Sequence, residues 1–197
     1  MSRSRAPAFS DRQVVIFLEA VGNIPLEIFR KNQKPKNLKP FNYIKYLFKA
    51  TNQHGVHSPF IYSYLVNGLY KRKSFPENSL LSAWKKHNNF SKRKQKILNR
   101  TFSYFNDENF IKAHDNLFRE DKTVYFSLKE NSPEEILKQS NSFNLLVVDA
   151  IIEDAEKQKA WLFLKEHKGF NISIDLYDIG FLFRRNEQVK EDFRIRI

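Results

Sequence analysis

The spacing of apolar residues predicts helices in the first half of the chain. Over residues 41–48 (FNYIKYLF), apolar side chains recur at helical spacing, and this amphipathic helix is expected to end at the turn 52–55. Ser58 is the predicted N-cap of the next helix, because Pro59 follows it at the first helical position. An apolar, aromatic run then continues that helix to Tyr70.

Two further helices are predicted over residues 80–87 and 91–105. In the second, the sequence KRKQK supplies the polar surface, and one apolar face is expected to be buried, made of Ile97, Leu98, Phe102 and Phe105. Trp84 and Trp161 could stack on a nucleic-acid base, but both lie in helical patterns, so packing in the core is the expected role.

Beyond residue 105 the pattern changes to strands alternating with helices. Residues 123–128 are strand-like, and the continuously apolar LLVV within 143–150 is typical of a strand covered on both faces. Helices are predicted over 133–139, entered through Ser132, and over 153–168, with Gly169 as the C-cap.

The end of the sequence alternates between apolar and polar residues. Ile172, Ile174 and Leu176 predict a strand with one buried face, and a turn at 178–180 leads into residues 181–185. The final FRIRI is expected to direct Phe193, Ile195 and Ile197 inward. A strand, a crossover helix and a closing antiparallel pair together predict an α/β fold with a mixed sheet.

Composition and charge divide the chain into three regions. Hydrophobic residues make up 41% of the sequence, which is enough to build a core. We predict a basic arm over 1–40, a helical lead-in over 41–105 and an α/β domain over 106–197. Residues 1–100 hold 20 of the 34 basic residues but 4 of the 22 acidic ones. The densest basic stretch, 71–100, has aromatic neighbours, so nucleic-acid binding is an alternative to a solvated basic face.

Several classes of protein are disfavoured. The chain has no cysteine, which excludes disulfides, thiolate metal sites and a cysteine nucleophile. The uninterrupted apolar stretches are shorter than the roughly 18 residues that span a bilayer, so we expect no membrane partner. The apolar run 14–18 is bracketed by Asp11 and Glu19, which disfavours a secretion signal. We therefore expect a cytoplasmic protein.

Two segments of the sequence resemble a known family. Residues 52–60 (NQHGVHSPF), after an aromatic helix, are similar to the HGxHSPF lead-in of bacterial class I S-adenosylmethionine-dependent methyltransferases, and residues 159–197 resemble the last helix and strands of those proteins. The resemblance implies an open Rossmann-like sheet that ends in an antiparallel hairpin, with S-adenosylmethionine bound beyond the carboxyl ends of the first strands. The roughly 30 residues between position 115 and Phe143 are too few for the several strand and helix units that a complete domain places there, so a truncated sheet is expected.

The resemblance fails where the cofactor should bind. By position, residues 108–111 correspond to the first strand and residues 112–115 to the turn that faces the cofactor, which makes His114 and Asp115 the candidate cofactor-binding residues. The sequence has no glycine between Gly68 and Gly169, although such a turn needs close approach of the backbone to its ligand. We therefore expect that S-adenosylmethionine is not bound. As a catalytic dyad, His114 and Asp115 are disfavoured because adjacent residues rarely face each other.

Asp149 is the candidate catalytic residue. The family carries paired acidic residues before its final helix, and the match here, 148–153, keeps the first acid as Asp149 and has Ala150 in the second position. A general base or divalent-metal site needs converging ligands, so a degenerate protein without methyl transfer is the main hypothesis. An active enzyme with an atypical pocket is the alternative. His54 and His57 could belong to a metal or acid–base site, but we predict no metal and expect them to hydrogen-bond backbone in their turn.

Overall fold

The computed structural model describes residues 39–71, 79–105, 122–185 and 188–197, which belong to one compact unit spanning Lys39–Ile197. The predicted arm over 1–40 lies outside the described residues except for its last two positions. The predicted strand 108–111 and the turn with His114 and Asp115 also lie outside them.

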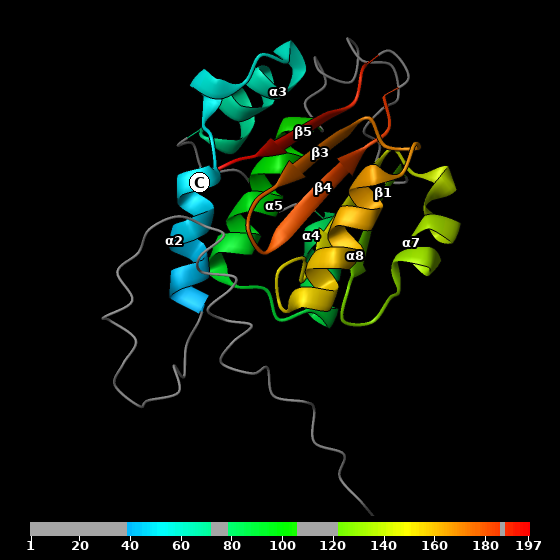
Figure 1. Ribbon diagram of the computed structural model, residues 1–197. Helices are drawn as coiled ribbons and strands as arrows, with labels where there is room; N and C mark the ends of the chain where they lie inside the picture. Colours follow the sequence, from blue (N-terminus) through cyan, green and yellow to red (C-terminus); the bar gives the residue numbers. More distant parts are fainter. Residues whose placement is uncertain (1–38, 72–78, 106–121, 186–187) are drawn as a thin grey trace, which may run out of the picture. The chain divides into compact units, whose positions relative to one another are not determined.

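A five-stranded mixed sheet forms the centre of this unit (Figure 1). Its order is β1-β2-β4-β3-β5, and β4 runs antiparallel to both of its neighbours while the other pairs are parallel. The predicted mixed α/β fold and the antiparallel pair near its end, β3 with β4, are therefore confirmed. The strand bounds are Thr123–Ser127 for β1, Leu145–Asp149 for β2, Ile172–Asp175 for β3, Ile179–Phe183 for β4 and Glu191–Arg194 for β5.

The helices of the first half agree with the apolar spacing. They are α2 (Lys39–Lys49), α3 (Pro59–Tyr64), which continues as a π-helix over Leu65–Leu69, α4 (Ser79–His87) and α5 (Lys92–Phe105). Ser58 is the N-cap residue of α3 and Pro59 opens the helix, as predicted, although the Ser58 side chain makes no capping hydrogen bond.

Two helices follow in the second half. In α7 (Pro133–Gln139), Ser132 and Glu135 form a reciprocal capping box, which satisfies two backbone N–H groups at the helix start. Asp154 caps α8 (Ala155–Glu166), whose C-cap is the extended His167. The predicted C-cap at Gly169 is therefore wrong. Among the described helices, none combines the length and the apolar character that crossing a bilayer requires.

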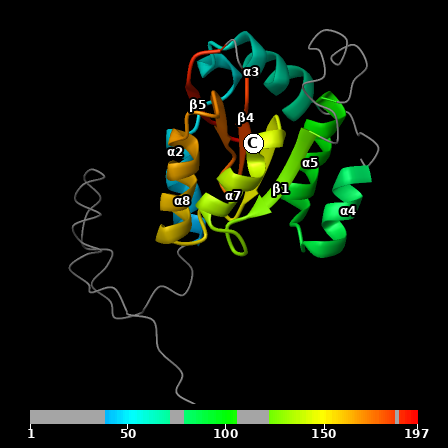
Figure 2. The same cartoon turned by 90° about the vertical axis from the view of Figure 1, so that its right-hand side faces the viewer.

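Helices cover both faces of the sheet (Figures 1 and 2). One core joins α3, α4 and α5 to the sheet residues Val147, Ile174 and Phe181, while a second core joins α7 and α8 to Leu146, Val148 and Leu182. This arrangement explains the continuous apolar run of β2. All four residues of β3 are buried as well, so the prediction of one buried face there is wrong. The alternation of apolar and polar residues distinguished the two faces of the strand, but the polar face is covered too.

Gly180 allows the second core to close. A Cβ at this position would lie 2.4 Å from the ring of Trp161, which packs directly on the backbone of β4. Trp161 is 3% exposed, so its predicted core position is confirmed, and Trp84 packs partly buried against the first core. The turn predicted over 178–180 lies over 176–178 instead, with Leu176 N–H donating to the carbonyl of Ile179 at 3.0 Å.

The segment after α2 is hydrogen-bonded to the end of β5 and the residues that follow it. Thr51 forms a parallel bridge with Ile195, supported by N–H donation from Thr51 to Arg194 at 2.8 Å and from Arg196 to Thr51 at 3.0 Å. The buried Tyr46 hydroxyl hydrogen-bonds backbone carbonyls of Asp175 and Ile195, the first at 3.0 Å. Ile195 is fully buried, as the alternation predicted.

Candidate functional site

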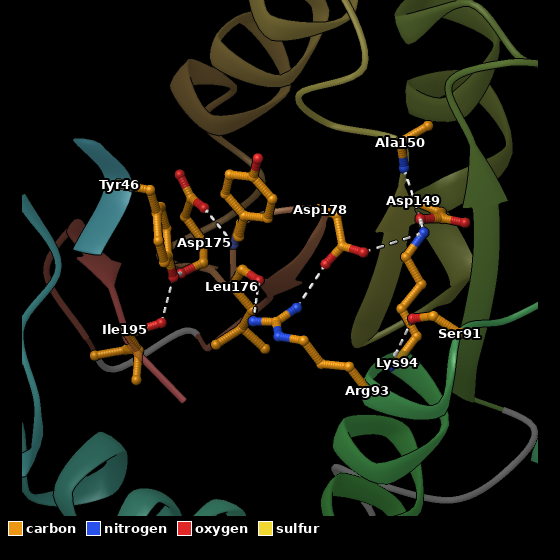
Figure 3. Close-up of polar contacts among 11 residues, drawn as sticks. Tyr46, Ser91, Arg93, Lys94, Asp149, Ala150, Asp175, Leu176, Asp178 and Ile195 are labelled. Atoms are coloured by element: carbon orange, nitrogen blue, oxygen red, sulfur yellow. Dashed lines mark hydrogen bonds and ion pairs between the residues drawn. The ribbon is translucent and has the colours of Figure 1, made fainter. Parts of the chain in front are cut away.

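Asp149 lies at the end of β2, where three parts of the fold meet. It pairs with Ser127, the last residue of β1, so the carboxyl ends of both parallel strands share one end of the sheet. The turn between β3 and β4 and the start of α5 also lie here (Figure 3). We call this region, defined by Arg93, Lys94, Asp149 and Asp178, the carboxyl-end cluster.

Both oxygens of the Asp149 carboxylate accept hydrogen bonds. Oδ1 accepts from the Lys94 ammonium and, at 2.7 Å, from the backbone N–H of Ala150. Oδ2 accepts from the Tyr125 hydroxyl at 2.9 Å. Since the Asp149 side chain is 11% exposed, these donors replace most of the water that a carboxylate needs.

Asp178 completes the cluster. Its carboxylate pairs with Arg93 at 2.7 Å and with Lys94 at 3.6 Å, and Arg93 also donates to the Leu176 carbonyl at 2.9 Å. Two acids are thus matched by two bases in close contact (Figure 3). Charge-assisted bonds of this kind tie the first turn of α5 to the sheet.

The local sequence explains why α5 begins here. Ser91 accepts a hydrogen bond from the Lys94 backbone N–H at 3.3 Å, as an N-cap residue does. Cations in the first turn of a helix are disfavoured by the helix dipole. Asp149 and Asp178 offset that cost, which is why Arg93 and Lys94 are directed toward the sheet.

Two residues beside the cluster hold strained backbone conformations. Ala150 has φ 62° and Tyr177 has φ 80°, both in the left-handed region that residues other than glycine rarely adopt. The Ala150 N–H donates to the Asp178 carbonyl at 3.1 Å as well as to Asp149, and these two bonds stabilise its conformation. Strain that is retained in this way concentrates at functional sites and ligand clamps.

Two tyrosines beside the carboxyl-end cluster have raised pKa values. Burial, with the Asp149 carboxylate as the next cause, raises the pKa of Tyr125, so this phenol keeps its proton and donates it to Asp149. Burial and the Asp178 carboxylate likewise raise the pKa of Tyr177. Because its oxygens are already engaged, Asp149 is poorly placed to accept a proton from a substrate or to bind a cation.

Of the three predicted cofactor-binding and catalytic residues, the structure describes one. Asp149 is in the cluster, whereas His114 and Asp115 lie outside the described residues. His54 and His57 are exposed, and His54 contacts the Gln53 side chain at 3.2 Å instead of backbone. Within the same ranges, no three acidic or histidine side chains gather as a metal site would require.

Sequence reasoning missed the partners of Asp149. The run KRKQK was assigned to the surface, but Arg93 and Lys94 are directed to the carboxyl-end cluster, and Arg100 donates to the Leu69 carbonyl at 2.7 Å. The available signal was two cations in the first turn of a helix, where acids are favoured. Lys92 and Lys96 are exposed, as predicted for that surface.

Comparison of the chain with protein-family models, curated proteins and solved structures finds no match. The site is therefore interpreted from its own geometry.

Proposed function

We propose that this chain is a methyltransferase-like α/β protein that has lost methyl transfer and acts as a binding or regulatory module. The proposal starts from the two segments that resemble class I methyltransferases, 52–60 and 159–197. A mixed sheet with the antiparallel pair of β3 and β4 is compatible with a truncated Rossmann-like domain. The first of those segments packs into the same core as the sheet, through Val56 and Phe60.

The observation that carries the proposal is the engagement of Asp149. In the resemblance, this residue is the remaining member of an acidic pair at the carboxyl end of a strand. Here it is held by Lys94, Tyr125 and the Ala150 N–H, and its side chain is 11% exposed. Freeing it for substrate would leave Lys94, 16% exposed, without its closest carboxylate.

S-adenosylmethionine does not fit the described residues at this end of the sheet. The ligand carries a positive sulfonium, and Arg93 and Lys94 already bring two positive charges to the carboxyl-end cluster. The hydroxyls of its ribose need a free carboxylate oxygen, but both oxygens of Asp149 accept bonds from the protein. We therefore derive no chemical step for this ligand.

Calorimetric titration of S-adenosylmethionine into the full chain tests the proposal. We expect no saturable heat, in the wild type or in Asp149→Asn. The matched control is Glu166→Gln, which removes an exposed carboxylate on α8. A micromolar dissociation constant that Asp149→Asn weakens and Glu166→Gln does not would replace this proposal with the active-enzyme alternative.

That alternative requires transfer of a labelled methyl group to an acceptor. The transfer should disappear in Asp149→Asn while the melting temperature shows that the variant is folded. Activity that survives in Asp149→Asn would remove this residue from the mechanism, even if the protein proved to be an enzyme.

Nucleic-acid binding through residues 71–100 is the other alternative, and its support is the exposed Lys92 and Lys96 on one face of α5. Arg93, Lys94 and Arg100 are engaged within the protein, which leaves fewer cations for phosphates. If this alternative holds, affinity for generic DNA should fall steeply with salt and should fall further in Lys92→Gln/Lys96→Gln. A flat response to salt would exclude it.

A further inference from the structure

Helix α2 presents an apolar pair to solvent. Ile44 is 50% exposed and Phe48 is 87% exposed, and the two residues are four positions apart, so they share one face of the helix. The opposite side of α2 contacts the rest of the fold through the buried Tyr46. The sequence of α2 contains three lysines and no acidic residue, and Lys49, next to Phe48, is exposed. We call Ile44, Phe48 and Lys49 the α2 face.

A groove between α7 and α8 offers an apolar lining. It begins directly after β1 and has a volume of about 400 Å³. Its apolar lining residues are Leu128, Pro133, Ala160 and Phe163, and Phe163 is 50% exposed, so the lining is accessible from solvent. The volume is comparable to that of sites that enclose small ligands, so the groove can take in two apolar side chains.

The rim of this groove is acidic. Six acidic and three basic residues occur in the two segments that border it, 129–135 and 153–159, although the whole chain has a net charge of +12. Among the lining side chains, Glu134 and Glu156 are exposed and form no ion pair with a described residue. Lys157 also lines the groove, but it is already paired with the N-cap aspartate of α8 at 2.6 Å. The region is therefore a negative patch on a positive protein, and it attracts a cationic partner.

The α2 face and the groove lie at opposite edges of the same sheet. Thr51, which follows α2, bridges to Ile195 after β5, and β5 is one edge strand. The groove begins at Leu128 after β1, which is the other edge strand. Figure 1 shows α2 and α7 on opposite sides of the unit. Because Tyr46 and Thr51 hydrogen-bond α2 and the residues after it to the β5 edge, the α2 face cannot enter the groove of its own chain.

We propose that the groove between α7 and α8 binds the α2 face of a second copy of this chain. Ile44 and Phe48 enter the apolar lining as anchors four residues apart, and the lysine-bearing helix meets the acidic rim. Each copy uses a different surface, so the contact is heterologous and joins copies head to tail. A single helix in a groove is a small contact, so the association is weak. It is independent of the proposed function, because neither Asp149 nor a cofactor takes part.

Sedimentation velocity of the full chain over a series of concentrations tests the association. We expect the mean sedimentation coefficient of the wild type to rise with concentration. Phe48→Ser and Phe163→Ser should each weaken the association at least about tenfold, because each removes an aromatic anchor. The matched controls are Val189→Ser and Leu162→Ser, at positions that are 79% and 52% exposed and lie outside both surfaces, and they should leave it unchanged. A wild-type chain that stays monomeric at the highest concentration would overturn the proposal.

Mixing the two variants distinguishes a head-to-tail contact from a symmetric one. Phe48→Ser keeps its groove and Phe163→Ser keeps its α2 face, so an equimolar mixture should form a one-to-one dimer although each variant alone stays monomeric. The dimer cannot grow further, because the surfaces that remain free are the altered ones. Self-association of either variant alone, or a mixture that stays monomeric while the wild type associates, would contradict the proposal.

The contribution of charge is tested at the rim of the groove. Glu156→Gln removes a lining carboxylate, and its matched control Glu166→Gln removes an exposed carboxylate from the other end of α8. We expect Glu156→Gln to weaken the association about two- to fivefold at low ionic strength, with a smaller effect at high salt. Equal effects of the two substitutions would contradict recognition of α2 by the acidic rim, whatever the outcome of the S-adenosylmethionine titration.

Discussion

The two ends of the sheet treat charge in opposite ways. At the carboxyl end, Arg93 and Lys94 each contact a carboxylate, and Tyr125 and a backbone N–H complete the coordination of Asp149. At the amino end, Arg184 contacts a hydroxyl and an aromatic ring. A matched group of charges holds elements of the fold together, whereas Arg184 pairs with no carboxylate among the described residues.

This contrast changes which end should be searched for function. In open α/β sheets, ligands usually bind beyond the carboxyl ends of the strands. Here that end is filled by protein side chains that satisfy one another. The amino end, which the usual rule would neglect, holds the half-buried Arg184.

The largest effect is expected from Lys94→Met. The substitution leaves Asp149 without its ion-pair partner in a site that is 11% exposed, so we expect a loss of about 2–4 kcal/mol in the free energy of unfolding, measured with urea. In Lys94→Met/Asp149→Asn, the combined loss should be smaller than the sum of the two single losses. Lys96→Met, an exposed position on the same helix, should change stability by less than about 0.5 kcal/mol. Equal losses at both lysines would show that the cluster is not a structural contact.

A smaller effect is expected from Tyr125→Phe, which removes one donor to Asp149. We expect a loss of about 1–2 kcal/mol at neutral pH, compared with little change in Tyr62→Phe, a position that is 47% exposed. The pKa of Tyr125 is raised in the folded chain, so its contribution is complete below the ordinary value of 10.0 and is lost as the pH rises toward the folded pKa. The free energy of unfolding should therefore fall less steeply with rising pH in Tyr125→Phe than in the wild type, above the ordinary tyrosine pKa of 10.0. An unchanged slope of unfolding free energy against pH would contradict the burial of the Tyr125 hydroxyl.

Asp175→Asn should act in the opposite direction. Burial raises the pKa of this carboxyl above its ordinary value of 3.8, so the native state loses stability as the pH rises through the folded pKa. The amide avoids that loss and can still accept the Tyr177 N–H bond, which is 3.0 Å long. We expect a gain of roughly 0.5–1 kcal/mol at neutral pH and none at pH values below 3.8, measured by urea unfolding across pH. Destabilisation at neutral pH would mean that the contact of Asp175 with Arg194 outweighs its burial.

The smallest effect is expected from Arg184→Met at the amino end. The variant loses one hydrogen bond and a ring contact, but it also removes a half-buried cation that no described carboxylate pairs with, so stability should change by less than about 0.5 kcal/mol. A loss above about 2 kcal/mol, measured in the same way, would show that Arg184 is a structural residue and would remove the contrast between the two ends.

Much of the fold was predictable because it depends on local periodicity. The apolar face of α5, the continuous run of β2 and the start of α7 at Ser132 are all encoded within a few residues. The errors occurred where exposure depends on distant elements. Ser173 and Asp175 alternate with apolar residues as in a half-exposed strand, yet β3 is covered on both sides.

The candidate site was less predictable than the fold. Asp149 was identified from its place at the end of a strand, but its contact with Lys94 joins residues 55 positions apart. The contacts of Arg184 with Ser140 and Phe170 likewise join residues that no single motif connects. Such contacts are set by strand order. The antiparallel pair of β3 and β4 was predicted, but the position of β4 between β2 and β3 could not be derived from the alternation of side chains.

The bond from Tyr46 to the Ile195 carbonyl spans 149 residues of sequence. At translation rates of about 5–20 residues per second, the ribosome needs on the order of ten seconds to make the partner after α2 has emerged. During that interval, the hydroxyl of Tyr46 and the backbone of Thr51 have to rely on water. Docking of α2 is therefore expected to be a late event in the biogenesis of this protein, and a chaperone that shields aromatic helices would have its best opportunity there.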